Sequence, residues 1–375
     1  MKSKVNIFII VIQVSNLIVQ LEKSLFYQKI LGKVLFNNSD FIYRLEWMLV
    51  AAYSFNYPDK LKMSFEKESK FKFNTNVPED YLSQTIDEEK LNTLLNKLYK
   101  EEFETEKENI ENLSDKVNYH KRKFEIKKDD YKKKFSYLIE EVMGIFNSEI
   151  DTLKYSNLKI QYYDDPNSSV EASCEPIGDS TSLMSVNLSR PISYDKAQQL
   201  ASHELTHHVQ FVLTEKMFIN FPEMKIIQDS MPFSMLLEGG AELAVDLIYT
   251  DVIRAASLSK VVSISEDKIK TILEIERLTW GESWPKIINL SKSFINNEIS
   301  KDQLIEDLEL KCFKPHNSWP NADFIQSYRT YIQSYGWGKE LIRRYLEKQG
   351  KLNLKGYIEF MKKPLTPSNI MSLLK

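Results

Sequence analysis

The chain has 375 residues, enough to bury a substantial core in one large or two medium domains, and its hydrophobic content of 42% is ordinary for a globular protein. A formal net charge of -3 gives no field strong enough to attract nucleic acid, so we expect no nucleic-acid partner. Only 10 glycines and 12 prolines stand among many Lys, Glu, Leu and Ile residues. We therefore predict an α+β fold that is predominantly α-helical.

Two features of the sequence bear on the cellular compartment. An apolar run from Val5 to Val19 follows Lys2 and Lys4, as in the charged and hydrophobic regions of a signal peptide. Four polar residues interrupt this run, no small-x-small cleavage site follows, and a bilayer span needs about 20 apolar residues. Cys174 and Cys312 have no C-x-x-C companion, which favours a reducing compartment. We expect a buried segment in a cytoplasmic protein, with secretion as the alternative and no membrane partner.

The segment from Asp87 to Phe146 is dense in Glu and Lys. Apolar residues recur in it at an interval of seven, from Phe103 to Ile145, but the positions three residues later are mostly polar. This seam is too narrow for a coiled coil, which needs both positions filled. We predict a long, largely solvated helix or a helical hairpin broken near residues 112–115, and we interpret His120 as a surface residue.

Three short stretches with β-type alternation follow the charged segment. They are Leu158–Tyr163, Val170–Cys174 and Ser182–Leu188, with a turn at Asp165–Asn167 between the first two. We predict three strands that together form a small sheet directly before the next helix.

That helix is predicted from Tyr194 to Leu213 and contains an H-E-x-x-H motif. His203 and His207 are four residues apart, so their imidazoles lie one turn apart on one face, spaced to hold one metal ion. Glu204 can take a proton from a water bound to that metal, which is why the motif indicates a metallohydrolase. All three side chains share the apolar stripe of the helix, where polar groups are costly unless a cation satisfies them.

A second acidic cluster, L-E-G-G-A-E, follows in another apolar helical segment and offers a third ligand. Glu238 and Glu242 are four residues apart, so one can bind the metal while the other accepts the ring N–H of a ligating histidine. Gly239 and Gly240 between them are expected to let the two helices approach closely.

With HELTHHVQ followed by LLEGGAELA, the chain resembles the gluzincins, H-E-x-x-H zinc metallopeptidases whose third ligand is a glutamate on the following helix. It is most similar to less characterised branches whose second helix reads E-G-x-A-E. The resemblance covers residues 181–250 well and the C-terminal third loosely. Gln210 and Leu213 stand where the longer metzincin pattern has Gly and His. The resemblance implies Zn²⁺ held by His203, His207 and Glu238, with Glu204 as general base and Glu242 orienting a ligand, His203 first.

The resemblance also implies how a substrate is bound and activated. An edge strand, with Ser182–Leu188 as the candidate, pairs with an extended peptide; the alternative is an ordinary hairpin. A tyrosine of the C-terminal region hydrogen-bonds the oxyanion, with Tyr335 as first choice and Tyr331 as second. His316 is a further candidate donor. For either tyrosine, packing in the core is at least as open an interpretation, and a lone loop histidine such as His316 is more often structural.

Together these observations predict a zinc-dependent peptidase that acts on a peptide or protein substrate through a zinc-activated water. Residues 1–150 are expected to form a helical N-terminal region, and residues 151–375 a zincin-like metallopeptidase domain. The alternative is a non-catalytic helical binding protein that works through the surface of residues 87–146, with a structural or absent metal.

Overall fold

The computed structural model describes residues 77–375, except for residues 106–109, 111, 169, 191, 221–231, 315–319, 364 and 366. The apolar run from Val5 to Val19 and the candidate donor His316 therefore lie outside the described residues. Within the described part of the chain, no helix combines the length and the apolar character that crossing a bilayer requires.

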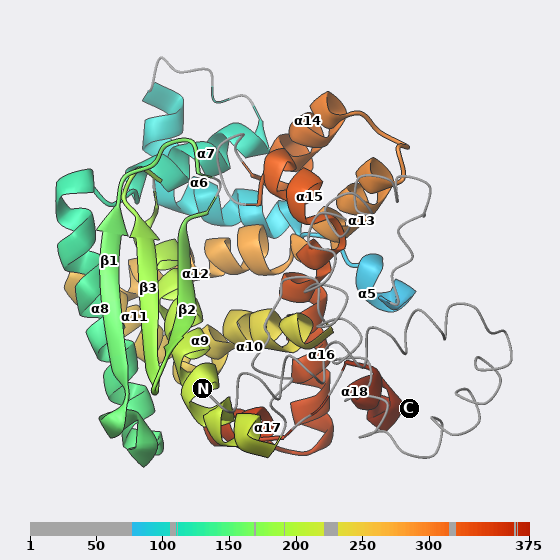
Figure 1. Cartoon of the computed structure of the whole chain (residues 1–375). Helices are drawn as coiled ribbons and strands as arrows, with labels where there is room; N and C mark the ends of the chain where they lie inside the picture. Colours follow the sequence, from blue (N-terminus) through green and yellow to red (C-terminus); the bar gives the residue numbers. More distant parts are fainter. Residues whose placement is uncertain are drawn as a thin grey trace, which may run out of the picture.

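Helices dominate the described chain, with one small sheet, so the predicted α+β, mainly α-helical class is confirmed (Figure 1). Before the sheet come α5 (Glu79–Leu82), α6 (Glu88–Thr105), α7 (Leu113–Lys123), α8 (Lys128–Glu149) and the 3₁₀ turn η2 (Asp151–Tyr155). The strands are β1 (Asn157–Tyr163), β2 (Ala172–Gly178) and β3 (Thr181–Asn187). The helices α9 (Tyr194–Asn220), α10 (Pro232–Ile248), α11 (Asp251–Val262) and α12 (Glu266–Glu276) follow. The last elements are the π turn η4 (Arg277–Gly281), α13 (Trp284–Ile295), α14 (Lys301–Cys312), α15 (Ala322–Tyr328), the 3₁₀ turn η5 (Arg329–Ile332), α16 (Gln333–Lys348), α17 (Leu354–Met361) and α18 (Pro367–Leu374).

The charged segment forms three helices rather than one. The first break lies where it was predicted, because Asn112 caps α7: its side chain accepts the N–H of Asp115, whose carboxylate accepts the N–H of Asn112. A second break, between α7 and α8, was not predicted. There the N–H of Ile126 donates to the carbonyl of Ile192 at 2.8 Å, which ties the connection to the start of α9.

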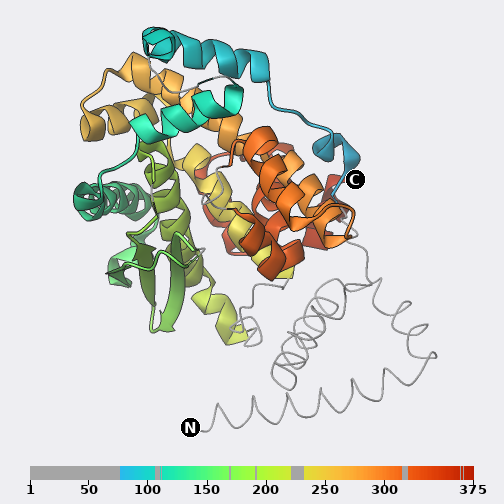
Figure 2. The same cartoon turned by 90° about the horizontal axis from the view of Figure 1, so that it is seen from above.

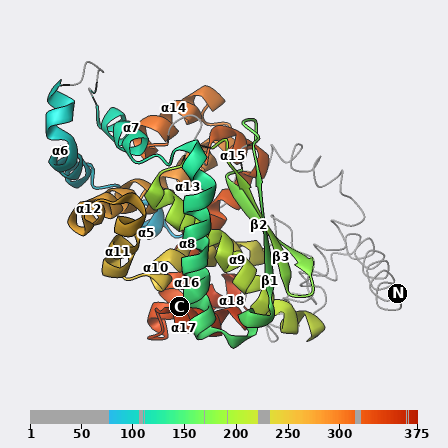
Figure 3. The same cartoon turned by 90° about the vertical axis from the view of Figure 1, so that its left-hand side faces the viewer.

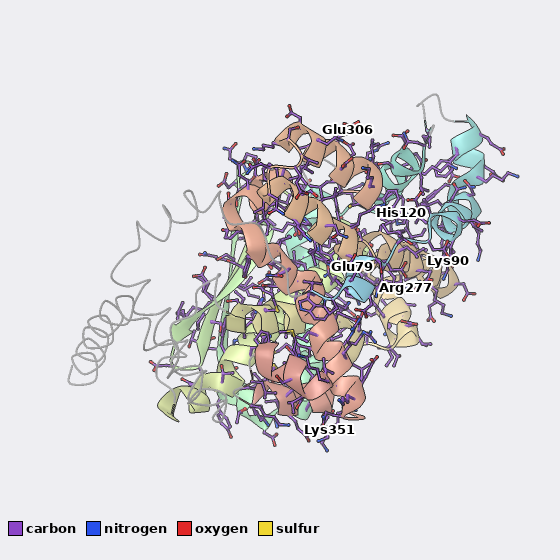
Figure 4. All side chains as sticks on the ribbon, turned by 90° about the vertical axis from the view of Figure 1, so that its right-hand side faces the viewer. Glu79, Lys90, His120, Arg277, Glu306 and Lys351 are labelled. Atoms are coloured by element: carbon purple, nitrogen blue, oxygen red, sulfur yellow. The ribbon has the colours of Figure 1, made fainter. Side chains whose placement is uncertain are left out.

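The interpretation of His120 as a surface residue is wrong. Its side chain is only 3% exposed, and Nδ1 lies 2.8 Å from the hydroxyl of Tyr99. Figure 4 labels His120 on α7, which packs beside α6. Burial lowers the pKa of His120 to about 4. The residues next to His120 in the sequence are mostly polar, but they lie on other faces of α7. The polar composition of the segment therefore gave no indication that the face with His120 is buried.

The sheet has the order β1-β3-β2, with β1 parallel and β2 antiparallel to β3. The prediction that Ser182–Leu188 is an edge strand is therefore wrong, because β3 pairs on both sides. The edge strand beside the helices is β2, which packs against α9 and stands on the side of the sheet that faces the helical body (Figure 1).

Helix α9 runs through the centre of the molecule, between the sheet and the C-terminal helices (Figure 2). It begins at Tyr194 as predicted but continues to Asn220, beyond the predicted end at Leu213. Residues 197–211 are buried on every face. Helix α8 packs along α9 on one side (Figure 3), and α10 packs on another. The polar side chains of α9 must therefore be satisfied inside the protein.

The two glycines of α10 serve helices other than the one predicted. A Cβ on Gly239 would lie 2.1 Å from the carbonyl carbon of Gly338, so the backbones of α10 and α16 touch at this point. A Cβ on Gly240 would lie 2.1 Å from the hydroxyl of Tyr357 on α17. The glycines thus allow α16 and α17 to pack closely against α10, and they do not serve the approach of α9.

Candidate metal centre

The structure brings the three predicted metal ligands together. The Nε2 atoms of His203 and His207 are 3.1 Å apart, and Oε2 of Glu238 lies 3.2 Å from the first and 3.5 Å from the second. A tetrahedral metal ion with bonds of about 2.0–2.1 Å needs ligand atoms about 3.3 Å apart. Neighbouring turns of α9 and the facing turn of α10 therefore present a group that can hold a metal ion.

The donor set also favours a cation chemically. Burial alone would lower the pKa of His203, but its contacts with Glu238 and Glu242 outweigh burial and raise the pKa to about 10. Burial would raise the pKa of Glu238, yet the neighbouring imidazoles of His207 and His203 hold it well below the usual range. The negatively charged carboxylate of Glu238 thus lies against the imidazole rings of both His203 and His207. Two imidazole nitrogens with one carboxylate oxygen are a common zinc ligand set.

Glu204 lies beside the ligands and is only 4% exposed. Among the described residues, its Oε2 has no hydrogen-bond partner. Burial raises the pKa of this carboxyl, although His203 and His207 oppose the shift. A buried carboxylate with an unsatisfied oxygen is costly unless it serves a bound group, and this position suits a proton acceptor next to a metal ion.

Glu242, the residue predicted to orient a ligand, lies next to His203. Its Oε1 lies 3.2 Å from Nδ1 of His203. Its Oε2 accepts from the side chains of Gln199 at 2.9 Å and Trp280 at 3.2 Å. Burial would raise the pKa of Glu242, but the contact with His203 outweighs it and lowers the pKa to about 2.

His207, the second candidate ligand, has a partner that the sequence analysis did not predict. Nδ1 of His207 lies 2.8 Å from Oε1 of Gln210, one helical turn further along α9. From the sequence, Gln210 was noted only because it stands where the longer metzincin pattern has Gly. Its i+3 spacing from His207 was the available signal, because residues three apart on a helix are neighbours.

The two candidate tyrosines occupy different places. The hydroxyl of Tyr331 donates to Oε1 of Glu238 at 2.7 Å, so the second choice contacts a ligand directly. The ring of Tyr335 stacks on the ring of His203, with centroids 6.1 Å apart and planes 16° apart. Burial, followed by the charge of Glu238, raises the pKa of Tyr335 well above its usual value, which keeps its hydroxyl protonated.

The cluster opens into a cavity of about 510 Å³. Residues 170–176, which include most of β2, line this cavity, as do His203, His207, Glu238 and Glu204. Four aromatic side chains from α15, η5 and α16 also line the cavity, namely Phe324, Tyr328, Tyr331 and Tyr335. A molecule in the cavity can therefore reach the ligands and Glu204 together.

The free edge of β2 borders this cavity. The carbonyl of Glu171 accepts the N–H of Asn187 at 2.9 Å, so residue 171 faces β3. Because antiparallel pairing alternates, Ala172, Cys174 and Pro176 turn their main-chain groups away from β3. Proline has no N–H, so the free edge offers donors at residues 172 and 174 only.

Comparisons of this chain with protein-family models, with curated proteins and with solved structures found no match. The site is therefore described by its geometry: His203, His207 and Glu238 lie close enough together to hold a metal ion.

Proposed function

We propose that the protein is a zinc-dependent peptidase of the gluzincin type. The observation that carries this proposal is the convergence of His203, His207 and Glu238 in the lining of an open cavity, with the buried carboxylate of Glu204 beside them. This constellation combines a place for a metal ion, a proton acceptor and room for a substrate.

The donor count favours a catalytic site over a structural one. A structural zinc has four protein ligands, whereas a catalytic zinc keeps one position for water or substrate. Among the residues described, the group contains three candidate ligands and no fourth His, Cys, Asp or Glu. This supports a peptidase over the alternative of a binding protein with a structural metal.

In the proposed reaction, zinc held by the cluster supplies Lewis-acid chemistry, because it polarises a carbonyl and acidifies water near neutral pH. Glu204 accepts a proton from the attacking water and delivers it to the leaving amine. Glu242 and Gln210 hold the rings of the two ligating histidines from behind. The hydroxyl of Tyr335 is the candidate donor to the negative charge that develops on the substrate carbonyl oxygen.

The shape of the cavity supports a peptide or protein substrate. An extended chain can add to the free edge of β2 through main-chain hydrogen bonds at Ala172 and Cys174. This role passes to β2 from Ser182–Leu188, because that segment is the central strand of the sheet.

Metal content and metal-dependent cleavage test the proposal together. We expect one zinc per chain by elemental analysis and cleavage of a peptide mixture that a chelator abolishes. Glu204→Gln should retain zinc and reduce kcat by at least about 100-fold, because the proton acceptor is lost. Glu276→Gln is the matched control: Glu276 is also a buried glutamate, it pairs with Arg254, and it does not line the cavity.

Three outcomes would contradict the proposal. Full activity in Glu204→Gln would exclude Glu204 as the proton acceptor. An equal loss of activity in Glu276→Gln would show that the loss in Glu204→Gln comes from a general loss of stability. Stoichiometric zinc without chelator-sensitive cleavage would favour the binding protein.

A further inference from the structure

Gln210 makes three hydrogen bonds and is only 1% exposed. Its Nε2 donates to the carbonyl of Leu237 at 2.8 Å and to the hydroxyl of Tyr357 at 2.9 Å. Both amide protons are then engaged, so the oxygen that faces Nδ1 of His207 at 2.8 Å is an acceptor. Nδ1 of His207 must therefore carry the proton, which leaves the Nε2 lone pair directed at the metal cluster.

The same amide fixes the position of α10 relative to α9. Leu237, whose carbonyl it binds, immediately precedes the third ligand Glu238. A sliding movement between the two helices would break the bond to Leu237 and so release the amide that faces His207 on the same helix. Gln210 thus sets both the tautomer of one ligand and the position of the backbone that carries another.

Tyr357 holds this amide from a part of the chain far away in sequence. It lies on α17, 147 positions after Gln210, and its side chain is fully buried. Burial raises its pKa, and the bond from Gln210 opposes the shift only in part, so the hydroxyl stays neutral. Gly240 leaves the space that the hydroxyl occupies, because a Cβ there would lie 2.1 Å from it.

We propose that Gln210 and Tyr357 are positioning residues of the metal centre. Tyr357 orients the Gln210 amide, and the amide orients His207 and holds α10 in place at Glu238. This inference rests on the metal centre of the proposed function but does not require that the protein cleaves peptides.

A positioning role differs measurably from a contribution to packing. Loss of the acceptor at residue 210 frees His207 to rotate and to take the other tautomer, and partners of this kind change metal affinity by about 10- to 100-fold. Gln198 provides the matched control, because it is a buried glutamine on the same helix with two hydrogen bonds, from its Nε2 to Ser257 and to its Oε1 from Arg254. Neither partner of Gln198 is a metal ligand.

The experiment measures the zinc dissociation constant of the full chain by competition with a chromophoric chelator, and the visible absorption spectrum of the cobalt-substituted protein. We expect Gln210→Met to weaken zinc binding by about 10- to 100-fold and to change the cobalt spectrum. Gln210→Glu keeps an acceptor for Nδ1 of His207 but loses the donor to the carbonyl of Leu237, so its zinc affinity should lie between those of the wild type and Gln210→Met. Tyr357→Phe should weaken binding by about three- to tenfold, and Gln198→Met should leave both readouts unchanged.

Wild-type zinc affinity and an unchanged cobalt spectrum in Gln210→Met would overturn the proposal, as would an equal loss in Gln198→Met. If Gln210→Met does not fold, Tyr357→Phe decides: wild-type affinity in that variant overturns the proposal, and the expected loss supports it. A wild-type protein that binds zinc but cleaves no peptide would end the peptidase proposal and leave these positioning roles standing. A wild-type protein that binds no zinc would end both.

Discussion

Two tyrosines stand beside the metal ligands, and their contacts separate their roles in the proposed reaction. Tyr331 donates its hydroxyl to the ligand Glu238, so its removal acts first on that carboxylate. Tyr335 stacks on the ring of His203 and lines the cavity, so its phenol is placed to act on a substrate. Each role predicts a different kinetic signature for the same change from Tyr to Phe.

Tyr331→Phe should weaken zinc binding by about tenfold, because Glu238 loses a hydrogen bond to a charged group. Tyr335→Phe should retain zinc and lower kcat by about 100-fold, the loss seen when one donor to a developing oxyanion is removed. Zinc competition titration and peptide kinetics on both variants check this pair. Unchanged kcat in Tyr335→Phe would exclude Tyr335 as the donor, and a loss confined to Tyr331→Phe would transfer the role to Tyr331.

At the scale of elements, β2 is the part of the sheet that a substrate can reach. Its main-chain groups alternate between β3 and the free edge, so neighbouring residues differ in what their N–H groups serve. Ala172 faces the edge, whereas Ser173 pairs with β3. A proline at residue 172 removes an N–H from the free edge, whereas a proline at residue 173 removes an N–H that bonds to β3. The two substitutions therefore test the two sides of the strand separately.

Ala172→Pro should leave the sheet intact and raise KM for peptides by about tenfold, because one main-chain hydrogen bond to the substrate is lost. Ser173→Pro should instead lower the unfolding temperature, because the lost N–H belongs to the ladder with β3. Steady-state kinetics and thermal unfolding of both variants check the prediction. An unchanged KM in Ala172→Pro would mean that the substrate does not pair with β2.

The sequence predicted best the elements whose signals are local. The start of α9 and the strands β1 and β3 lie within one residue of their predicted bounds, because the periodicity that marks a helix or a strand is read over a few neighbouring positions. The order of the strands is set by pairing between distant segments, which no local pattern carries. That is why Ser182–Leu188 was placed at an edge when it forms the centre.

The same division holds for the candidate site. The ligands were predicted because i, i+4 spacing on a helix fixes the geometry of His203 with His207 and places Glu204 beside them. The support behind His207 was not predicted. Gln210 is held by Tyr357, 147 positions away, and only the packing of α17 against α9 and α10 brings the two residues together.

At the scale of the whole molecule, one core joins elements from both sides of residue 150. Phe135 and Phe146 of α8 share this core with Leu205 of α9 and Tyr357 of α17. The domain boundary at residue 150 stays a prediction. A second cluster, between α6, α7 and α12, lies apart from the metal site and contains Tyr99 and Phe124, the neighbours of His120.

We expect the burial of His120 beside that second cluster to make the stability of the fold depend on pH. Burial lowers the pKa of His120 to about 4, the charge of Asp195 opposes the shift, and Lys121 adds to it. The unfolded chain has an ordinary histidine, with a pKa of about 6.5. Between these values the unfolded state binds a proton that the folded state does not, so stability is complete above the upper value and is lost as the pH falls.

We expect His120 to cost the wild-type protein about 1.4 kcal/mol of unfolding free energy per pH unit across a window of roughly two units. His120→Gln should remove this slope, because glutamine can accept from Tyr99 but does not titrate. Tyr99→Phe is the control: it loses the hydrogen bond at every pH yet keeps the imidazole and therefore the slope. Urea unfolding of the three proteins between about pH 7 and about pH 4.5 measures the difference.

Equal slopes in the wild type and His120→Gln would show that His120 titrates normally in the folded protein. A slope lost in Tyr99→Phe as well would assign the pH dependence to the packing of α6 on α7 rather than to the imidazole itself.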